Sequence, residues 1–200
     1  MAGVDEVGRG ALAGPVVAGA VIFNHKILLD KESFFSNNEV KDSKLLSAKK
    51  REAVFKKISD LAATATGEVS HTTIDEINIL EATRLAMKKA VLSLGVTPDI
   101  ILIDGNISID VDIPQISVPG GDRVCFSISA ASIVAKVVRD KMMDDMHEVY
   151  CDYNFRKNKG YGTKEHFMNL SSYGVSPIHR KSFSPVKDII LTGKIKNPWL

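Results

Sequence analysis

The chain has 200 residues, 44% of them hydrophobic, and a formal net charge of +2. A chain of this length can bury one sizeable core, so we expect a single domain over residues 1–200, with two small domains as the alternative. No apolar run approaches the length of about 20 residues that spans a bilayer, and the start lacks the basic and apolar parts of a leader peptide. Two cysteines, Cys125 and Cys151, are too few for a disulfide framework. We therefore expect a soluble, cytoplasmic protein without membrane contact.

The charges are unevenly distributed along the chain. Residues 1–155 contain 17 Lys and Arg against 22 Asp and Glu, whereas residues 156–187 contain seven against Glu165 alone. Phosphates attract Lys and Arg and release counterions when they are bound. The C-terminal part, residues 150–200, is therefore a candidate surface for a polyanion. The simpler explanation of such a basic segment is a solvated face.

In chain order, the patterns of the first half predict strands and a helix. Residues 2–7 and the apolar run 16–23 are expected to be strands joined by a glycine-rich turn, and the charged stretch 24–46 is expected to be a loop. A helix over 48–62 and a strand over 64–70 follow. Both elements continue an alternating α/β arrangement.

The second half continues this alternation. Thr73 and Glu76 have the spacing of a capping box, and the apolar residues that follow keep a helical period up to Gly95. A short apolar strand then ends on Asp104, and a long helical pattern covers residues 126–148. The expected order is strand, strand, helix, strand, helix, strand, helix. This order predicts a mixed β-sheet flanked by helices.

Several acids stand beside glycines where predicted elements end. Asp5 and Glu6 precede Gly8, which allows the strand to end or bend so that two side chains of opposite faces serve one site. Asp104 is followed by a glycine, and Asp122 follows two glycines ahead of a helix that starts with small residues. Carboxylates that converge in this way are typical ligands of hard cations such as Mg²⁺.

Each of these signals has a simpler explanation. An Asp after a strand is more often a turn former or a helix cap. Asp140 is a second candidate for the fourth acid; we prefer Asp122, because Asp140 lies within a helical run between Arg139 and Lys141. The chain has no GxGxxG fingerprint, no GxxxxGK[ST] phosphate loop and no HxxxH array, which disfavours nucleotide-cofactor and zinc sites.

Seven segments nevertheless occur together and in a fixed order. They are GVDEVGRGALAGPVV, KDSKLLS, IDEINILEATRLAM, ILIDG, GGD followed by AASIVAKVVRD, NKGYGT with EH, and SPIHRKSF. Together they closely resemble the ribonuclease HII family, the type 2 ribonucleases H, from residue 2 to residue 187. The resemblance implies a ribonuclease H-like α/β fold with a helical C-terminal part. It also implies an endonuclease that cuts the RNA strand of RNA–DNA hybrids and nicks duplex DNA 5′ of single embedded ribonucleotides.

The resemblance assigns metal ligands and products. Asp5, Glu6, Asp104 and Asp122 match the family's ligand positions, and this set coincides with the acids that their placement singles out. The implied cofactors are Mg²⁺ or Mn²⁺, with two ions in the substrate complex. Two ions roughly 3.5–4 Å apart promote an in-line displacement at phosphorus. The implied products have 3′-hydroxyl and 5′-phosphate ends.

The resemblance also assigns substrate contacts. The backbone of Gly8, Arg9 and Gly10 is expected to grip the ribonucleotide and sense its 2′-hydroxyl, a group that DNA lacks. Tyr161, between two glycines, is expected to contact the sugar of the next deoxynucleotide; its simpler explanation is a partly buried aromatic. The remaining expected contacts, with phosphates or the nucleic-acid backbone, are Lys44, His179, Arg180 and Lys181.

Three alternatives stay open at this point. A resolvase or integrase-like enzyme would use the same carboxylate chemistry without needing a 2′-hydroxyl, and a non-catalytic module would bind nucleic acid through residues 156–187 alone. The related type 3 enzyme carries an additional N-terminal domain. The expected partners are RNA–DNA hybrids and duplex DNA that contains ribonucleotides. The C-terminal KIKNPWL has no clear sliding-clamp motif, and we expect a monomer.

Overall fold

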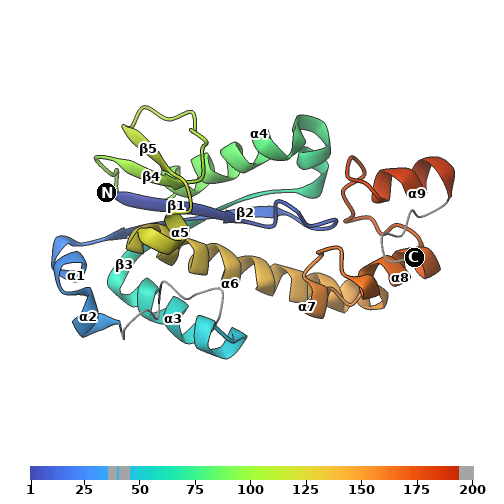
Figure 1. Ribbon diagram of the computed structural model, residues 1–200, viewed down its shortest axis with the longest axis horizontal. Coiled ribbons are helices and arrows are strands. Elements are labelled where there is room, and N and C mark those ends of the chain that lie inside the picture. Colours follow the sequence, from blue (N-terminus) through green and yellow to red (C-terminus); the bar gives the residue numbers. More distant parts are fainter. Residues whose placement is uncertain (36–39, 41–45, 194–200) are drawn as a thin grey trace. The chain divides into compact units, whose positions relative to one another are not determined.

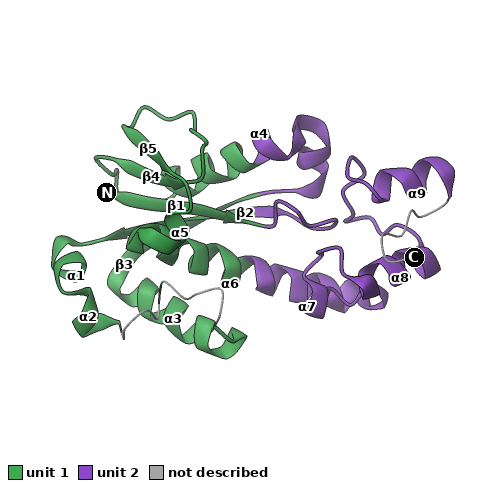
Figure 2. Ribbon diagram, viewed as in Figure 1, with its two compact units in different colours: residues 1–7, 17–68, 83–138 green, residues 8–16, 69–82, 139–200 purple. Residues whose placement is uncertain are grey.

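The computed structural model describes residues 1–35, 40 and 46–193 (Figure 1). The chain divides into two compact units, shown in green and purple in Figure 2. Unit 1 consists of residues 1–7, 17–68 and 83–138, and unit 2 of residues 8–16, 69–82 and 139–200. Among the helices of the described residues, none is both long and apolar enough to cross a membrane.

The predicted mixed sheet is confirmed and forms the centre of unit 1. Its strands are β1 (Ala2–Val7), β2 (Val16–Phe23), β3 (Ala62–Val69), β4 (Ile101–Asp104) and β5 (Gln115–Val118), in the spatial order β3-β2-β1-β4-β5. Strand β1 is antiparallel to β2 and parallel to β4, and β4 is parallel to β5. The sequence patterns predicted the first four strands and missed β5, which has only four residues and exposes Ile116.

The helices follow the predicted order, with additions. They are α1 (His25–Leu29), α2 (Lys31–Phe34), α3 (Ala48–Leu61), α4 (His71–Leu92), α5 (Gly121–Val124), α6 (Phe126–Val149), α7 (Phe155–Asn158), α8 (Lys164–Tyr173) and α9 (Val186–Thr192), with a 3-10 turn η2 at Cys151–Tyr153. The loop predicted over 24–46 is wrong where that stretch is described, because it contains α1 and α2. Asn24 caps α1 by accepting the N–H of Ile27, and Ile27 is buried.

Helix α4 begins differently from the prediction. The capping box predicted at Thr73 and Glu76 is wrong: the hydroxyl of Ser70 accepts the N–H of Thr73 at 3.2 Å, two residues into the helix. The helix is then interrupted at Asn78, whose φ of 68° lies in the left-handed region that Asn tolerates better than most residues. The Asn78 side chain accepts the N–H of Leu80 at 2.9 Å and so restarts the helix.

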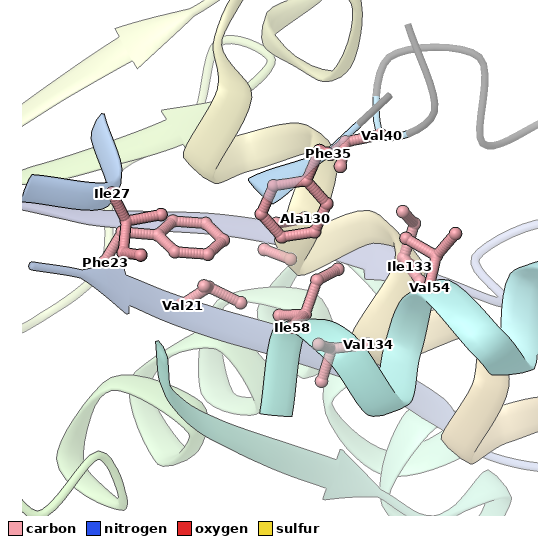
Figure 3. Packing of buried hydrophobic residues seen from close by; sticks show 11 residues of the cluster. Val21, Phe23, Ile27, Phe35, Val40, Val54, Ile58, Ala130, Ile133 and Val134 are labelled. Atoms are coloured by element: carbon pink, nitrogen blue, oxygen red, sulfur yellow. The ribbon is translucent and has the colours of Figure 1, made fainter. Parts of the chain in front are cut away.

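One hydrophobic cluster of unit 1 lies between β2 and helices α3 and α6 (Figure 3). Val21 and Phe23 of β2 pack there with Ile58 of α3, and the ring of Phe23 meets that of Phe35 edge to face at 6.0 Å. The other buried members are Ile27, Val40, Val54, Ala130, Ala131, Ile133 and Val134. Hydrophobic burial therefore holds both helices on this part of the sheet.

Two glycines let helix α6 approach the sheet of unit 1 at backbone distance. A Cβ atom at Gly3 of β1 would lie 2.2 Å from the carbonyl carbon of Ser127, and one at Gly19 of β2 would lie 2.4 Å from the carbonyl oxygen of Ala131. Any larger residue would push the helix away. Gly19 is also the residue paired with Asp5 across the strands, so this close approach occurs beside the predicted site.

Unit 2 contains the predicted helical C-terminal part and has its own core. Leu12 and Ala13, from the glycine-rich turn, are buried together with Met143 of α6 and with Phe155 of α7. The rings of Tyr153 and Phe155 stack at 5.4 Å. The remaining buried members are Phe167, Leu170, Ile178 and Val186. The turn after β1 is therefore part of the C-terminal core and not an independent loop.

Candidate active site

The four predicted metal ligands all belong to unit 1, at the ends of neighbouring elements. Asp5 lies near the end of β1 and is 5% exposed; its Oδ1 accepts the N–H of Glu6 at 2.7 Å. Val4 of β1 pairs with Ile103 of β4. Asp5 and Asp104 are the residues that follow this pair on the two parallel, adjacent strands. Parallel strands bring their carboxyl ends to one edge of a sheet, and the geometry therefore groups these acids there.

Asp104 and Asp122 are linked through a glycine. The Oδ1 atom of Asp104 is buried and has no hydrogen-bond partner among the described residues. A Cβ at Gly121 would lie 3.3 Å from this oxygen, so the Gly121 backbone stands directly beside it. Asp122 follows in the short helix α5 and is 6% exposed. Asp122 was expected ahead of the long helix, and the structure adds the intervening turn α5, held by a bond from the Ser129 hydroxyl to the Asp122 carbonyl at 2.6 Å.

Burial and two neighbouring acids make it costly to ionise Asp5. Burial, and then the charges of Glu6 and Asp104, raise the pKa of Asp5 from 3.8 to about 8, although a hydrogen bond with Ser132 of α6 opposes the shift. A buried carboxyl with acidic neighbours is unfavourable as an anion unless a cation accompanies it. The electrostatics therefore favour a positive ion at this edge of the sheet.

The donor set fits a hard divalent cation. In the described part of the chain, no three His, Cys, Asp or Glu side chains are already spaced to surround an ion together. The donors present are carboxylate oxygens, the ligands that Mg²⁺ and Mn²⁺ prefer. Such an ion would give the buried oxygen of Asp104 a partner and would stabilise the ionised form of Asp5, whose pKa is raised without it. Asp140, the alternative fourth ligand, lies in unit 2, whereas the other acids lie in unit 1.

Within unit 2, Arg180 holds the glycine-rich turn. Its side chain is 0% exposed, and its guanidinium donates to the carbonyls of Gly8 at 2.7 Å, Arg9 at 2.8 Å and Gly14 at 3.0 Å. Burial, and then the charge of Arg139, lower the pKa of Arg180 to about 9. The expected phosphate contact of Arg180 is therefore corrected: its nitrogens are engaged by the turn and do not reach solvent.

Arg139 performs the same task and was missed by the sequence patterns, which noted it only as a neighbour of Asp140. It is also 0% exposed, and it donates to the carbonyls of Ala13 at 3.2 Å, Pro15 at 2.9 Å and Lys159 at 2.9 Å. A Cβ at Gly8 would lie 2.2 Å from its Nε, so only glycine fits there. A sequence signal existed: an arginine within an apolar, small-residue helix pattern.

Tyr161 lies beside the same turn. It forms an isolated antiparallel bridge with Ala11, and the Arg139 guanidinium is 5.3 Å from the centre of its half-buried ring. The N–H of Leu12 donates to the carbonyl of Gly160 at 2.8 Å. The structure therefore brings together the predicted ribonucleotide-sensing turn and the predicted sugar contact, which are about 150 residues apart in the sequence.

The other predicted substrate contacts are placed differently from one another. Lys181 is exposed, and its backbone N–H donates to Asp75 of α4 at 2.9 Å. His179 is 0% exposed and hydrogen-bonds within the protein, so an expected contact with the nucleic-acid backbone is corrected to an internal one. Lys44 lies outside the described residues.

The ribonuclease HII family model matches residues 2–186. The chain belongs to the ribonuclease HII family. It is 53% identical over 192 residues to ribonuclease HII of Ligilactobacillus salivarius, covering 96% of this chain and 72% of that protein. It is 50% identical over 190 residues to ribonuclease HII of Acholeplasma laidlawii, covering 94% and 89%.

Solved structures agree with this assignment. The ribonuclease H2 of Pyrococcus horikoshii OT3 superposes with a TM-score of 0.77 at 28% identity, over 94% of this chain and 95% of that chain. The RNase HII of Archaeoglobus fulgidus, solved in a complex with PCNA, gives 0.75 at 25% identity, over 93% and 96%. Bst-RNase HIII in complex with Mn²⁺ shares the fold, with a TM-score of 0.72 at 21% identity over 96% and 70%.

The ribonuclease HII assignment confirms the predicted class of enzyme. The protein is a ribonuclease H, a divalent-metal-dependent hydrolase that acts on the RNA of RNA–DNA hybrids. The family assignment, which spans both units, decides against a resolvase-like enzyme and against a module that binds nucleic acid without catalysis.

The raised pKa of Asp5 predicts a pH-dependent metal affinity. Below about pH 8 an ion must displace the Asp5 proton, so Mn²⁺ affinity should rise with pH by up to about tenfold per pH unit and level off above about pH 8. In the metal-free protein, the stability contributed by this group is fully present below pH 3.8 and is lost as the pH rises through about 8. Calorimetric titration with Mn²⁺ at several pH values measures the affinity.

Asp140→Asn is the matched control for this titration, because it removes a carboxylate of unit 2 and should keep the parent's pH dependence. Asp5→Asn should abolish that dependence together with tight binding. Equal Mn²⁺ affinity of the parent protein at about pH 6 and about pH 8 would contradict the assignment of a proton to Asp5.

The adjacent cations Arg180 and Lys181 should have opposite roles. Arg180→Ala removes one donor from each of three carbonyls and should lower the free energy of unfolding by about 2–4 kcal/mol, whereas Lys181→Ala should change it by less than about 0.5 kcal/mol. Lys181→Ala should instead weaken duplex binding and reduce its salt slope by about one. Urea denaturation and binding at several salt concentrations measure the two effects. Parent-like stability of Arg180→Ala would refute its structural role.

Proposed function

We propose that this ribonuclease H hydrolyses the phosphodiester on the 5′ side of ribonucleotides, in long hybrids and at single ribonucleotides embedded in duplex DNA. The products are 3′-hydroxyl and 5′-phosphate ends. The observation that carries the proposal is the group of acids at one end of the unit 1 sheet, in which Asp104 has a buried, unpartnered oxygen and Asp5 is destabilised as an anion.

Asp5, Glu6, Asp104 and Asp122 hold the metal in this proposal. Two divalent cations, Mg²⁺ or Mn²⁺, would supply Lewis-acid stabilisation of the in-line displacement and lower the pKa of the attacking water. The protein's own contribution is positioning. Ser132 orients the Asp5 carboxyl from helix α6, and the Gly121 backbone confines the Asp104 carboxyl. Both restraints limit the rotation of ligands before an ion binds.

The glycine-rich turn recognises the ribonucleotide in this proposal. Gly8 is buried, whereas Arg9 and Gly10 are exposed, so the backbone at these two residues is accessible to a sugar edge. Arg180 and Arg139 fix the carbonyls on the inner side of the turn. A rigid backbone donor or acceptor disfavours a sugar that lacks the 2′-hydroxyl, because the backbone group is then left without a hydrogen-bond partner.

The exposed cations of unit 2 bind phosphates in this proposal. Some of the basic residues counted in the sequence are engaged in ion pairs, namely Arg156 with Glu148, Lys157 with Glu165 and Lys159 with Asp144. Lys164, Lys181 and Lys187 are exposed and are the better candidates for the phosphates of the duplex. We infer that residues 1–200 act as one monomeric catalytic domain whose part beyond about residue 150 binds substrate.

The choice of Asp122 over Asp140 is testable. Loss of a group that only orients a metal ligand costs about 10–100-fold, so Asp122→Asn, which removes a ligand, should lower kcat/KM by at least about 100-fold. Asp140→Asn, the matched change in unit 2, should leave kcat/KM near the parent value. The substrate is a labelled duplex with one ribonucleotide, in Mg²⁺, beside an all-DNA duplex that should stay intact. Inactivity of Asp140→Asn with normal cleavage by Asp122→Asn would reverse the assignment.

The role of Tyr161 separates this enzyme from a nuclease that ignores the junction. Tyr161→Ala should lose about 1–3 kcal/mol of stacking, by analogy with base–aromatic contacts, and most strongly on a duplex with a single ribonucleotide. A long hybrid should be less affected, because its next sugar keeps a 2′-hydroxyl. The measurement is the ratio of kcat/KM for the two substrates.

Tyr161→Phe is the control that separates the ring from its hydroxyl. If packing dominates, the Tyr161→Phe ratio should lie near the parent's; a loss equal to that of Tyr161→Ala would assign the effect to a hydrogen bond. A Tyr161→Ala variant with the parent's ratio would refute the junction role.

A further inference from the structure

Two buried histidines of unit 2 are hydrogen-bonded to each other. His166 lies on α8 and His179 precedes the basic HRKS residues; both are 0% exposed. Their Nε2 atoms are 2.9 Å apart, with ring centres at 5.2 Å. A direct imidazole–imidazole bond needs one nitrogen to donate and the other to accept. The protonation of the pair is therefore constrained.

The outer nitrogens determine which atoms carry the protons. Nδ1 of His179 lies 3.0 Å from the backbone N–H of Ser176, which can only donate, so His179 carries its proton on Nε2. That proton is donated to Nε2 of His166, and His166 is therefore protonated on Nδ1. Nδ1 of His166 lies 2.9 Å from the carbonyl oxygen of Tyr161, to which it donates. The Ser176 hydroxyl, 2.7 Å from Nδ1 of His179, then also donates to that nitrogen, so one arrangement of two neutral rings satisfies every contact.

The surroundings keep both rings neutral. Burial lowers the pKa of His166, and burial followed by the nearness of His166 lowers the pKa of His179 to about 3. The aromatic rings of Tyr153 and Phe155 lie 5.0 and 5.7 Å from the ring of His179, and that of Phe155 lies 5.5 Å from His166. The hydrogen-bonded arrangement therefore persists across the pH range in which a nuclease works.

The hydrogen-bond relay from His179 through His166 ends at the main chain of Tyr161, whose N–H donates to the carbonyl of Asn158 at 2.9 Å. Tyr161 stands between Gly160, with a φ of 81°, and Gly162. Glycines on both sides permit many backbone conformations, so the direction of the Tyr161 ring depends on contacts made by its main chain as well as on the Arg139 guanidinium beside the ring. Its carbonyl accepts from His166 and, at 2.8 Å, from the N–H of Thr163. The main chain of His179 meanwhile forms an isolated antiparallel bridge with that of Ala13 in the glycine-rich turn.

We propose that His166 and His179 are positioning residues that fix the main chain of Tyr161 against the glycine-rich turn, and so determine how strongly the enzyme requires a deoxynucleotide after the ribonucleotide. This inference rests on the proposed junction role of Tyr161. Neither histidine touches substrate in this proposal. Both act through the Tyr161 carbonyl, and the pair couples that carbonyl to the bridge at Ala13.

Two conservative replacements of His166 separate positioning from general stability. His166→Asn places an amide N–H near the position of Nδ1 and can still donate to the Tyr161 carbonyl, but it loses His179. His166→Gln places its amide near the position of Nε2 and can still meet His179, but it loses the carbonyl. Each removes one imidazole and one buried hydrogen bond, so the two form a matched pair.

The measurement is the kcat/KM ratio of single-ribonucleotide duplex over long hybrid, with urea unfolding as the check of stability. The loss of one hydrogen bond of about 1 kcal/mol predicts that His166→Gln lowers the ratio about fivefold, toward that of Tyr161→Ala, while His166→Asn stays near the parent. A merely structural role would lower both rates together and leave the ratio unchanged. A parent-like ratio in a folded His166→Gln, with a lowered ratio in Tyr161→Ala, would overturn the relay alone.

A parent-like ratio in Tyr161→Ala itself would overturn the junction role, and the relay proposal with it. If the histidine variants do not fold, the ¹⁵N resonances of the parent's imidazoles still decide. The relay requires a proton on Nδ1 alone in His166 and on Nε2 alone in His179 at neutral pH. Reversed tautomers, or a doubly protonated ring at neutral pH, would overturn the relay. The required pattern in the folded parent, together with its loss in the unfolded variants, would support it.

Discussion

Burial of acids beside one another is the constraint on which the rest of unit 1 depends. Asp5 is buried next to Glu6 and within electrostatic reach of Asp104, so ionisation of Asp5 is unfavourable without a neighbouring positive charge. The fold supports this arrangement through close backbone packing. Gly3 and Gly19 let helix α6 lie against the strands, and Ser132 of that helix reaches the Asp5 carboxyl. The carboxyl of Asp5 is thereby held in a well-packed part of the protein before any cation binds.

Unit 2 buries positive charges instead of acids. Arg139 and Arg180 are both buried, and their hydrogen bonds go to backbone carbonyls of the glycine-rich turn and of Lys159. A buried guanidinium is tolerated when its planar donors are satisfied, and carbonyl dipoles can satisfy them without an acid. The turn that follows Asp5 and Glu6 is consequently held from inside. Its outer residues, Arg9 and Gly10, remain exposed.

The residues of the family's motifs therefore divide into two groups by exposure. The exposed Arg9, Gly10 and Lys181 can meet a substrate, whereas the buried His179 and Arg180 build the surface that presents those residues. Neighbours in the HRKS segment thus have different tasks, because one side of the chain faces the unit 2 core and the other faces solvent. A shared motif identifies an enzyme family, but burial decides which of its residues support a site and which contact a ligand.

The sequence by itself determined the enzyme family and the mixed sheet, and it predicted four acids as metal ligands. Strands at 2–7 and 16–23 coincide with β1 and β2, because their apolar residues and flanking glycines are local signals. The carboxylates were predicted because each stands at an element end. The short edge strand β5, the interruption of α4 at Asn78 and the helices of the 24–46 stretch carry weaker local signals, and they were missed.

Only the tertiary structure decided what the buried polar residues do. Arg180 binds carbonyls 166 to 172 residues away, and Arg139 binds carbonyls 124 and 126 residues away. The His166–His179 bond and its link to Tyr161 likewise depend on how α8 and the following loop meet. A local pattern records periodicity, turns and caps over a few residues. The partner of a buried donor is set by packing between distant segments, so its role appears only once the chain is folded.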